Sequence, residues 1–196
     1  MDARKDRLIE LLLLHAFQVR ENPPFTLASG KTSPYYVDCK SIMYSPEGLI
    51  LIGALGYDAV KPLGALAVGG LTLGADPMAC AIAMHSQQRS RSIRAFVVRK
   101  EVKDHGSQNW IEGDIAPGTK VCILDDVLTS GSSAIQAIER ARQAGLDVQD
   151  LLVLVDREEG GAEAVEAHGV VVHAVVTVSE LLARQHVMLA HKTADV

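Results

Sequence analysis

The spacing of apolar residues predicts a helix at the N-terminus and, after it, a short hairpin. An apolar stripe at three- and four-residue spacing predicts a helix over residues 2–20. Its members are Leu8, Leu11, Leu12, His15 and Val19. Pro23 and Pro24 follow, and proline does not continue a helix. Residues 25–40 then predict two short strands around a Ser-Gly-Lys turn, with Tyr35, Tyr36 and Val37 in the second.

From Pro46 onwards, helical patterns alternate with short, continuously apolar segments. Pro46 suits the first turn of a helix, and glycines that close two later helices support the pattern. The expected strands are 65–68, 93–98, 120–124, 148–155 and 170–178, and the expected helices are 74–88, 133–144, 159–168 and one that begins at 179. Strands that are apolar throughout indicate a parallel sheet with helices on both faces.

We therefore predict an α/β fold in one domain, residues 1–196. Residues 1–45 would form the N-terminal helix and a small hood, and residues 46–196 the α/β core. Lys100 to Pro117 is the one long polar stretch between strands, and loops of that length are usually functional or mobile.

Composition narrows the classes of partner. The formal net charge is −5, which argues against a surface that coats nucleic acid. The leucine run at 11–14 is too short to cross a membrane. Cys39, Cys80 and Cys122 are distant from one another and lack CxxC spacing, which favours reduced thiols over a disulfide or zinc site. We expect a cytoplasmic protein with neither nucleic-acid nor membrane partners.

The stretch VCILDDVLTSGSSAIQ, residues 121–136, carries the clearest chemical signal. An apolar strand ends in Asp125 and Asp126, and a loop of small hydroxyl residues leads into a helix. In parallel sheets, ligands bind beyond the carboxyl ends of strands. Two carboxylates there suit sugar hydroxyls, and backbone N–H groups at a helix N-terminus suit a phosphate. The alternative is that Asp126 only ends the strand and Ser132 or Ser133 caps the helix.

The same stretch resembles the phosphoribosyl-pyrophosphate (PRPP) motif of type I phosphoribosyltransferases. The resemblance implies that Asp125 and Asp126 hold the ribose 2′- and 3′-hydroxyls and that the following loop holds the 5′-phosphate. The residues it places at PRPP after the acidic pair are Val127, Leu128, Thr129, Ser130, Gly131, Ser132 and Ser133.

Three further stretches resemble orotate phosphoribosyltransferases, in the same order along the chain. They are FTLASGKTSPYYVD (25–38), RKEVKDHG (99–106) and LVDREEGG (154–161). The second resembles the mobile catalytic loop of that family. It implies PRPP contacts for Arg99, Lys100, Lys103 and His105. The implied catalytic residues are Lys103 and His105 together with Asp125 and Asp126. By themselves, the residues of this loop also fit a solvated charge run, and His105 a plain surface histidine.

The first and third stretches imply the site of the acceptor base. The resemblance places Arg157 against the orotate carboxylate, whereas an ion pair with Asp156, Glu158 or Glu159 is the alternative. Tyr36 could stack on a pyrimidine ring or be a core tyrosine. Thr129 and Lys31 are further candidate contacts to orotate.

Two positions depart from some family members. Ala28 and Thr72-Leu73 stand where those members carry lysine. Lys31 could substitute for the first lysine, and the backbone of residues 69–74 could share the binding of pyrophosphate.

The resemblance implies a glycosyltransferase that joins orotate to PRPP, giving orotidine 5′-monophosphate and pyrophosphate in pyrimidine (UMP) biosynthesis. Mg²⁺ would be held mainly by substrate and water, with no dedicated protein ligands. The implied assembly is a homodimer whose mobile loop reaches the partner's active site. The rival readings are a phosphoribosyltransferase for another base and a PRPP-sensing regulator that binds RNA or DNA.

Overall fold

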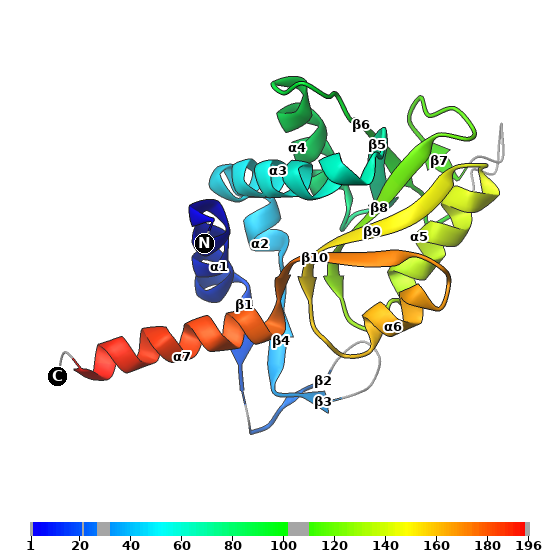
Figure 1. Ribbon diagram of the computed structural model, residues 1–196. Coiled ribbons are helices and arrows are strands. Elements are labelled where there is room, and N and C mark those ends of the chain that lie inside the picture. Colours follow the sequence, from blue (N-terminus) through cyan, green and yellow to red (C-terminus); the bar gives the residue numbers. More distant parts are fainter. Residues whose placement is uncertain (1, 21, 27–31, 102–109, 195–196) are drawn as a thin grey trace.

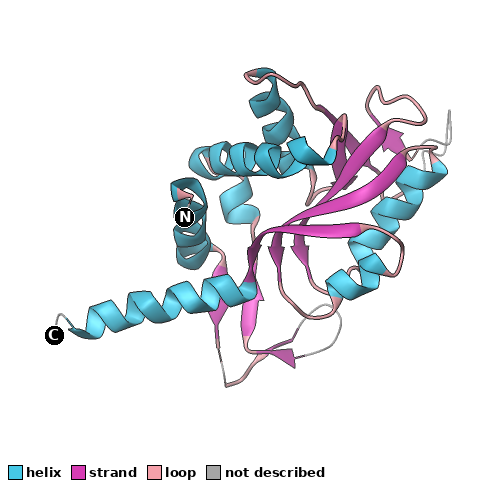
Figure 2. Ribbon diagram, viewed as in Figure 1, coloured by secondary structure: helices cyan, strands magenta, loops and turns pink. Residues whose placement is uncertain are grey.

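A mostly parallel sheet forms the centre of the protein (Figures 1 and 2). The computed structural model describes residues 2–20, 22–26, 32–101 and 110–194. Within them, the sheet has the strand order β10-β9-β8-β5-β6-β7, and only β7 runs antiparallel to its neighbour. Its strands are β5 (Ala67–Leu71), β6 (Arg94–Val98), β7 (Ile111–Glu112), β8 (Lys120–Leu128), β9 (Asp147–Asp156) and β10 (Val171–Thr177). The predicted α/β fold class is confirmed.

Helices cover both faces of the sheet, and two apolar clusters make up the core. The helices of the core are α3 (Pro46–Val60), the 3-10 helix η1 (Lys61–Leu63), α4 (Asp76–Gln87), α5 (Ser132–Gln143) and α6 (Gly161–Glu166). Figure 1 shows α3 and α4 on one face and α5 and α6 on the other. Ile52 and Ile82 belong to the first cluster, and Ile138 and Val165 to the second. Continuous burial from Asp150 to Val155 in β9 fits a strand covered on both sides.

The N-terminal region corrects two predictions. Helix α1 (Ala3–His15) ends earlier than residue 20, His15 is exposed, and Val19 lies in strand β1 (Phe17–Val19). Strand β2 (Phe25–Thr26) pairs with β3 (Thr32–Ser33), whereas β4 (Tyr35–Val37) pairs with β1. The predicted second strand is thus divided between two ladders, because Pro34 follows Ser33 and offers no N–H.

The remaining N-terminal and C-terminal helices pack beside the core. Helix α2 (Lys40–Met43) precedes α3, and Ser45 caps α3 by accepting a 3.0 Å hydrogen bond from the Gly48 N–H. The last helix, α7 (Val178–Ala194), contacts α1, where Lys5 and Glu180 form an ion pair of 2.6 Å. Leu8 of α1 lies in the same apolar cluster as α3, so the N-terminal helix and the sheet share one core.

Two differences from the predicted elements lie close to the functional motifs. Strand β8 continues to Leu128, four residues past its predicted end, so the acidic pair lies within the strand. The polar stretch Lys100–Pro117 contains β7. Residues 102–109 of that stretch lie outside the described residues.

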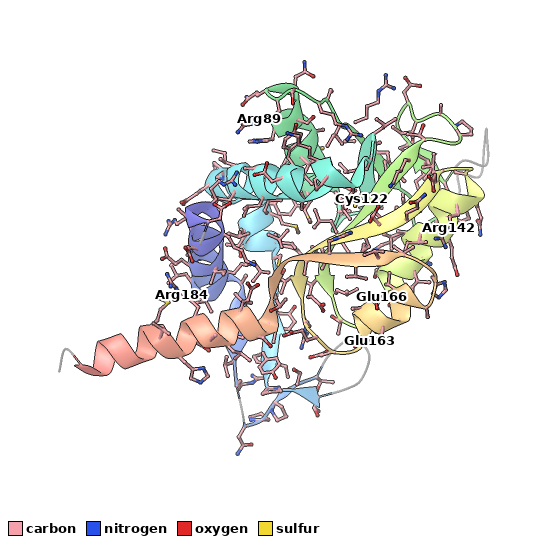
Figure 3. All side chains as sticks on the ribbon, viewed as in Figure 1. Arg89, Cys122, Arg142, Glu163, Glu166 and Arg184 are labelled. Atoms are coloured by element: carbon pink, nitrogen blue, oxygen red, sulfur yellow. The ribbon has the colours of Figure 1, made fainter. Side chains whose placement is uncertain are left out.

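The three cysteines differ in their exposure to solvent. Cys122 is fully buried in β8 (Figure 3), and burial raises its pKa. None of the three cysteines is in a disulfide, and Cys80 is exposed. Within the described residues, none of the helices combines the length and apolar character that a membrane crossing requires.

Candidate active site

A cavity of about 550 Å³ lies where the carboxyl end of β8 meets the N-terminus of α5 and the hood strands. It therefore occupies the edge at which parallel sheets bind ligands. The cavity is lined by Thr26, Tyr36, Val37, Asp38, Lys40, Asp125, Asp126, Val127, Thr129, Ser130, Gly131, Ser132, Ser133 and Arg157. Ligand contacts were predicted in the hood, at the acidic end of β8 and in the segment after β9. Residues from all three of these segments line this cavity.

Asp125 and Asp126 bring two carboxylates to the cavity on consecutive residues of β8. Asp125 is 9% exposed, and its Oδ1 accepts a 3.1 Å hydrogen bond from the Asp126 N–H. Burial, with the neighbouring negative charge of Asp126, raises the pKa of Asp125 to about 7. No described cation forms an ion pair with either carboxylate. Such a pair can accept hydrogen bonds from a diol or attract a cation.

The glycines of residues 69–74 lie in and just after β5, and none of them lines the cavity. A Cβ on Gly74 would lie 2.6 Å from Asp126 Oδ1, so a larger residue there would require that carboxylate to move. Gly69 and Gly70 belong to β5, where an added Cβ would meet the Phe96 and Leu124 carbonyls. The close approaches at residues 69–74 are therefore made by the protein's own strands and by Asp126.

The loop after β8 forms the opposite wall of the cavity. Gly131 has a φ of +80° and is itself the N-cap of α5, with no side-chain cap hydrogen bond. The alternative in which Ser132 or Ser133 caps the helix is therefore wrong, as is the idea that Asp126 ends the strand. Both serine side chains line the cavity instead, beside the N–H groups of the first helical turn.

Leu128 differs from the other residues of the predicted phosphate loop. Its side chain is fully buried and does not line the cavity, and its carbonyl accepts a 3.0 Å hydrogen bond from the Arg157 N–H. It thus holds β8 against the segment after β9 and cannot contact a ligand through its side chain. Val127 and residues 129–133 all line the cavity.

Arg157 connects the core to the hood and is only 4% exposed. Its Nη2 donates to Ser33 Oγ at 3.0 Å, to the Tyr35 carbonyl at 3.0 Å and to Glu159 Oε1 at 2.7 Å. The ion pair with Glu159 was the alternative to carboxylate binding, and it is present. The contact with Glu159 uses Nη2, so the Arg157 Nε remains buried without a hydrogen-bond partner among the described residues. Arg157 also lines the cavity.

Tyr36 lies at the mouth of the cavity, and two charged residues beside it had no assigned role in the sequence. Tyr36 is 38% exposed and stacks on Phe25 with ring centroids 5.6 Å apart, so it is not a core tyrosine. Lys40 Nζ lies 2.8 Å from Asp38 Oδ1. This hydrogen bond lowers the pKa of Asp38 and raises that of Lys40. Asp38 is the last residue of the stretch 25–38 that resembles the family, so the sequence did point to this residue as part of the site.

Of the predicted cationic residues at 99–105, the structure describes only Arg99 and Lys100, and neither of these two lines the cavity. Arg99 Nη1 donates to Glu112 Oε1 at 2.6 Å, and Arg99 Nε donates to the Glu101 carbonyl. Lys100 is exposed. Lys31, Lys103 and His105 lie outside the described residues.

The donor set near the cavity fits a magnesium ion that is shared with a substrate. Among the residues that the structure describes, no group of three or more His, Cys, Asp or Glu side chains could hold a metal ion. Mg²⁺ is often bound through one or two carboxylates together with substrate phosphates and water. Asp125 and Asp126 could supply those carboxylates.

Known proteins similar to the chain agree on one family, although no protein-family model matches it. Orotate phosphoribosyltransferase from Aquifex aeolicus is 47% identical over 178 residues, covering 91% of this chain and 97% of the relative. The enzyme of the same name from Sorangium cellulosum is 44% identical over 181 residues, covering 89% and 91%.

Solved structures give the same result. Mycobacterium tuberculosis orotate phosphoribosyltransferase in complex with PRPP has a TM-score of 0.75 and 36% identity, covering 91% of this chain and 98% of that one. Adenine phosphoribosyltransferase from Leishmania tarentolae, with a TM-score of 0.62 and 17% identity, shares the fold alone. With identities of this size over most of its length, the chain belongs to the orotate phosphoribosyltransferases, the enzymes of pyrimidine biosynthesis that transfer the 5-phosphoribosyl group from PRPP to orotate.

Proposed function

We propose that the cavity binds PRPP and orotate side by side, with the ribose at the acidic pair. The main support for this proposal is that one cavity is lined by Asp125 and Asp126, by the N-terminus of α5 and by Arg157. Asp125 and Asp126 accept from the ribose 2′- and 3′-hydroxyls. The 5′-phosphate lies at residues 129–133, where backbone N–H groups and the serine hydroxyls donate to its oxygens.

Orotate lies between the hood and Arg157. The buried, unpartnered Nε of Arg157 supplies a charged donor for the orotate carboxylate, because the Glu159 contact uses Nη2. Tyr36 lies at the mouth of the same cavity and offers its ring to the pyrimidine. Thr129 contacts the base from the loop, and Lys31 remains a proposed contact outside the described residues.

The reaction requires positioning and charge stabilisation rather than a protein nucleophile. The orotate nitrogen displaces pyrophosphate through an oxocarbenium-like ribose, with inversion at the anomeric carbon. A carboxylate at this acidic pair also favours positive charge that develops on the ribose. Mg²⁺, held mainly by substrate and water, supplies neutralising charge to the pyrophosphate.

The cations that meet the pyrophosphate come, in this proposal, from the partner subunit of a homodimer. The described residues of one chain support this, since Arg99 is paired with Glu112 and neither Arg99 nor Lys100 lines the cavity. Lys103 and His105 then serve as catalytic residues across the interface, with Arg99 and Lys100 at the base of the same loop.

An apolar face formed by α2, α3 and α4 is the surface that we assign to the second copy. Tyr44, Ile50 and Met84 line one groove on this face, and Leu73 lies just before α4 in the chain; all four are more than 60% exposed. Exposed apolar patches of this kind mark interaction sites. Leu73 directly precedes Gly74, which contacts Asp126, so a copy that docks here comes close to the ribose end of the site. Unpaired cysteines agree with a cytoplasmic location.

The direct test is incubation with PRPP, Mg²⁺ and orotate while the absorbance of orotate is followed. Uracil and hypoxanthine serve as parallel acceptors, and omission of Mg²⁺ tests the metal requirement. We expect turnover with orotate but not with uracil or hypoxanthine, and only when Mg²⁺ is present. Turnover with another base but not with orotate would refute the assignment of Arg157, and turnover without Mg²⁺ would remove the metal from the proposal.

A further inference from the structure

A second polar cavity, of about 340 Å³, lies at the opposite end of the sheet from the candidate active site. It is formed where α3 and α4 end and α1 begins. In Figure 3, Arg89 marks this region at the end of α4, on the far side of the molecule from the hood strands. Its lining residues are Arg4, Tyr57, Asp58, Lys61, Arg89 and Ser90.

Positive charge exceeds negative charge in this cavity, although the whole chain is acidic. Three cations line it against the single carboxylate of Asp58, which forms a 2.8 Å ion pair with Arg4. Lys61 and Arg89 form no ion pair with any carboxylate of the described residues. Two positive side chains are therefore available to an anion from solvent.

Stabilisation of the helix ends does not account for these two cations. Basic side chains often bind the last carbonyls of helices and complement the helix dipole. Here Arg91 does so, because its guanidinium donates to the carbonyls of Lys61 at 3.1 Å, Gly64 at 2.6 Å and Ala65 at 3.2 Å. The Lys61 amine and the Arg89 guanidinium donate to no carbonyl within the part of the chain that the structure describes.

A buried hydroxyl provides a second, independent sign of a ligand. Tyr57 is 2% exposed and lines the cavity, yet its hydroxyl has no hydrogen-bond partner among the described residues. Buried polar groups in native structures nearly always have one. Next to it, Arg89 Nε donates to His85 Nε2 at 3.1 Å, which fixes the guanidinium above the end of α4. Burial and the Arg89 charge lower the pKa of His85, which favours the neutral ring that accepts this hydrogen bond.

We propose that this cavity is a second anion site that binds a compact phosphate group. Its oxygens accept from the Tyr57 hydroxyl, the Lys61 amine and the Arg89 guanidinium, with Arg4 at the rim. The volume is at the lower end of the range for small-molecule sites, which suits inorganic phosphate or pyrophosphate. The site is separate from the catalytic cavity and does not depend on the function proposed for that cavity.

Crystals soaked in tungstate, an anomalously scattering phosphate mimic, locate the site directly. We expect a peak within hydrogen-bond distance of the Tyr57 hydroxyl, in addition to any peak at residues 129–133. A peak at the loop alone would overturn the proposal. Calorimetric titrations with phosphate and with pyrophosphate then show which of the two binds more tightly.

Variants separate a binding site from a merely structural cluster. Lys61→Gln with Arg89→Gln should weaken phosphate binding at this site at least about tenfold, since two charge-assisted contacts are lost. The matched control is Arg94→Gln with Arg184→Gln, which removes the same charge from ion pairs elsewhere on the molecule. Tyr57→Phe should weaken phosphate binding while thermal stability stays equal or rises. Equal phosphate affinities in both double variants would contradict the site.

Discussion

At the scale of single residues, Asp125 combines a cost to stability with a proposed contact to ribose. Its pKa of about 7 lies well above the ordinary value of 3.8 because the carboxyl is buried beside Asp126. The native state therefore holds a proton between about pH 4 and 7 that the unfolded chain has lost. Stability then falls as pH rises through that window.

Asp125→Asn should remove this decline. At pH 8 we expect the variant to unfold at higher denaturant concentration than the parent, by on the order of 2 kcal/mol, with little difference at pH 4. Its affinity for PRPP should drop at least about tenfold, because a carboxylate acceptor is lost. Urea unfolding at both pH values and PRPP titration measure the two effects. The control Asp114→Asn changes an exposed aspartate, and an equal effect there would contradict the explanation.

Arg157→Lys tests the acceptor site at one atom. Lysine keeps the charge but lacks the Nε–H and the planar fork, so kcat/KM for orotate should fall about a hundredfold or more. Binding of PRPP should stay within about twofold, because the acidic pair and the loop are untouched. Steady-state kinetics and PRPP titration distinguish these outcomes. Unchanged kinetics with orotate would show that Arg157 serves only to hold Ser33, Tyr35 and Glu159.

At the scale of elements, the turn from β8 into α5 depends on Gly131. Its φ is +80°, and an added Cβ would lie 2.9 Å from the Gly161 carbonyl. Gly131→Ala should therefore destabilise the protein by about 1–3 kcal/mol and raise the KM for PRPP. Gly118→Ala is the matched control, since its φ is +79° with open space around it. If both variants raised the KM equally, the loop geometry would not be the cause.

The segment after β6 is the second element with a proposed catalytic role. Lys103→Ala should lower kcat about a hundredfold or more while the unfolding midpoint changes little, because the lysine would act only on the leaving pyrophosphate. Stopped-assay kinetics and thermal unfolding measure both. Arg140 anchors the start of this segment by donating to the Arg99 carbonyl at 2.6 Å and lying over the Trp110 ring. A Lys103→Ala enzyme with wild-type kcat would exclude this role.

At the scale of the whole molecule, the exposed face of α2, α3 and α4 should hold the dimer together. Ile50→Glu with Met84→Glu places charges on residues that are 69% and 73% exposed, so the monomer should still fold. We expect a monomer by light scattering and loss of most activity. Val171→Glu with Val187→Glu changes exposed apolar residues elsewhere and should stay dimeric. If the Ile50→Glu, Met84→Glu variant remained a dimer, the dimer interface would have to lie on another face of the molecule.

Mixed dimers test whether one site uses residues of both chains. After Lys103→Ala and Asp125→Asn subunits are mixed, half of the dimers contain both. If Lys103 acts across the interface, one site in each mixed dimer is intact, and about a quarter of wild-type activity returns. If the two residues act within one chain, the mixture stays inactive.

Most of the core elements could be predicted because their signals are local. The apolar runs placed β6 and β9 within one residue at each end, and Ser45-Pro46 gave the start of α3. The errors have tertiary causes. Val19 fits a helical stripe, but pairing with Tyr35 places it in β1. Ile111 lies in polar sequence and becomes a strand because β6 offers it an open edge.

The sequence by itself determined the fold class, the family and the PRPP motif. The acidic pair and the loop are consecutive in the chain, so their proximity needs no folding to be known. The tertiary structure decided what surrounds them. Asp38, Lys40 and Arg157 reach the same cavity only because the hood folds over the end of β8. Burial raises the pKa of Asp125, and hydrogen bonds to residues more than 120 positions away orient Arg157. Contacts over such separations depend on the packing of the whole chain, which no local pattern encodes.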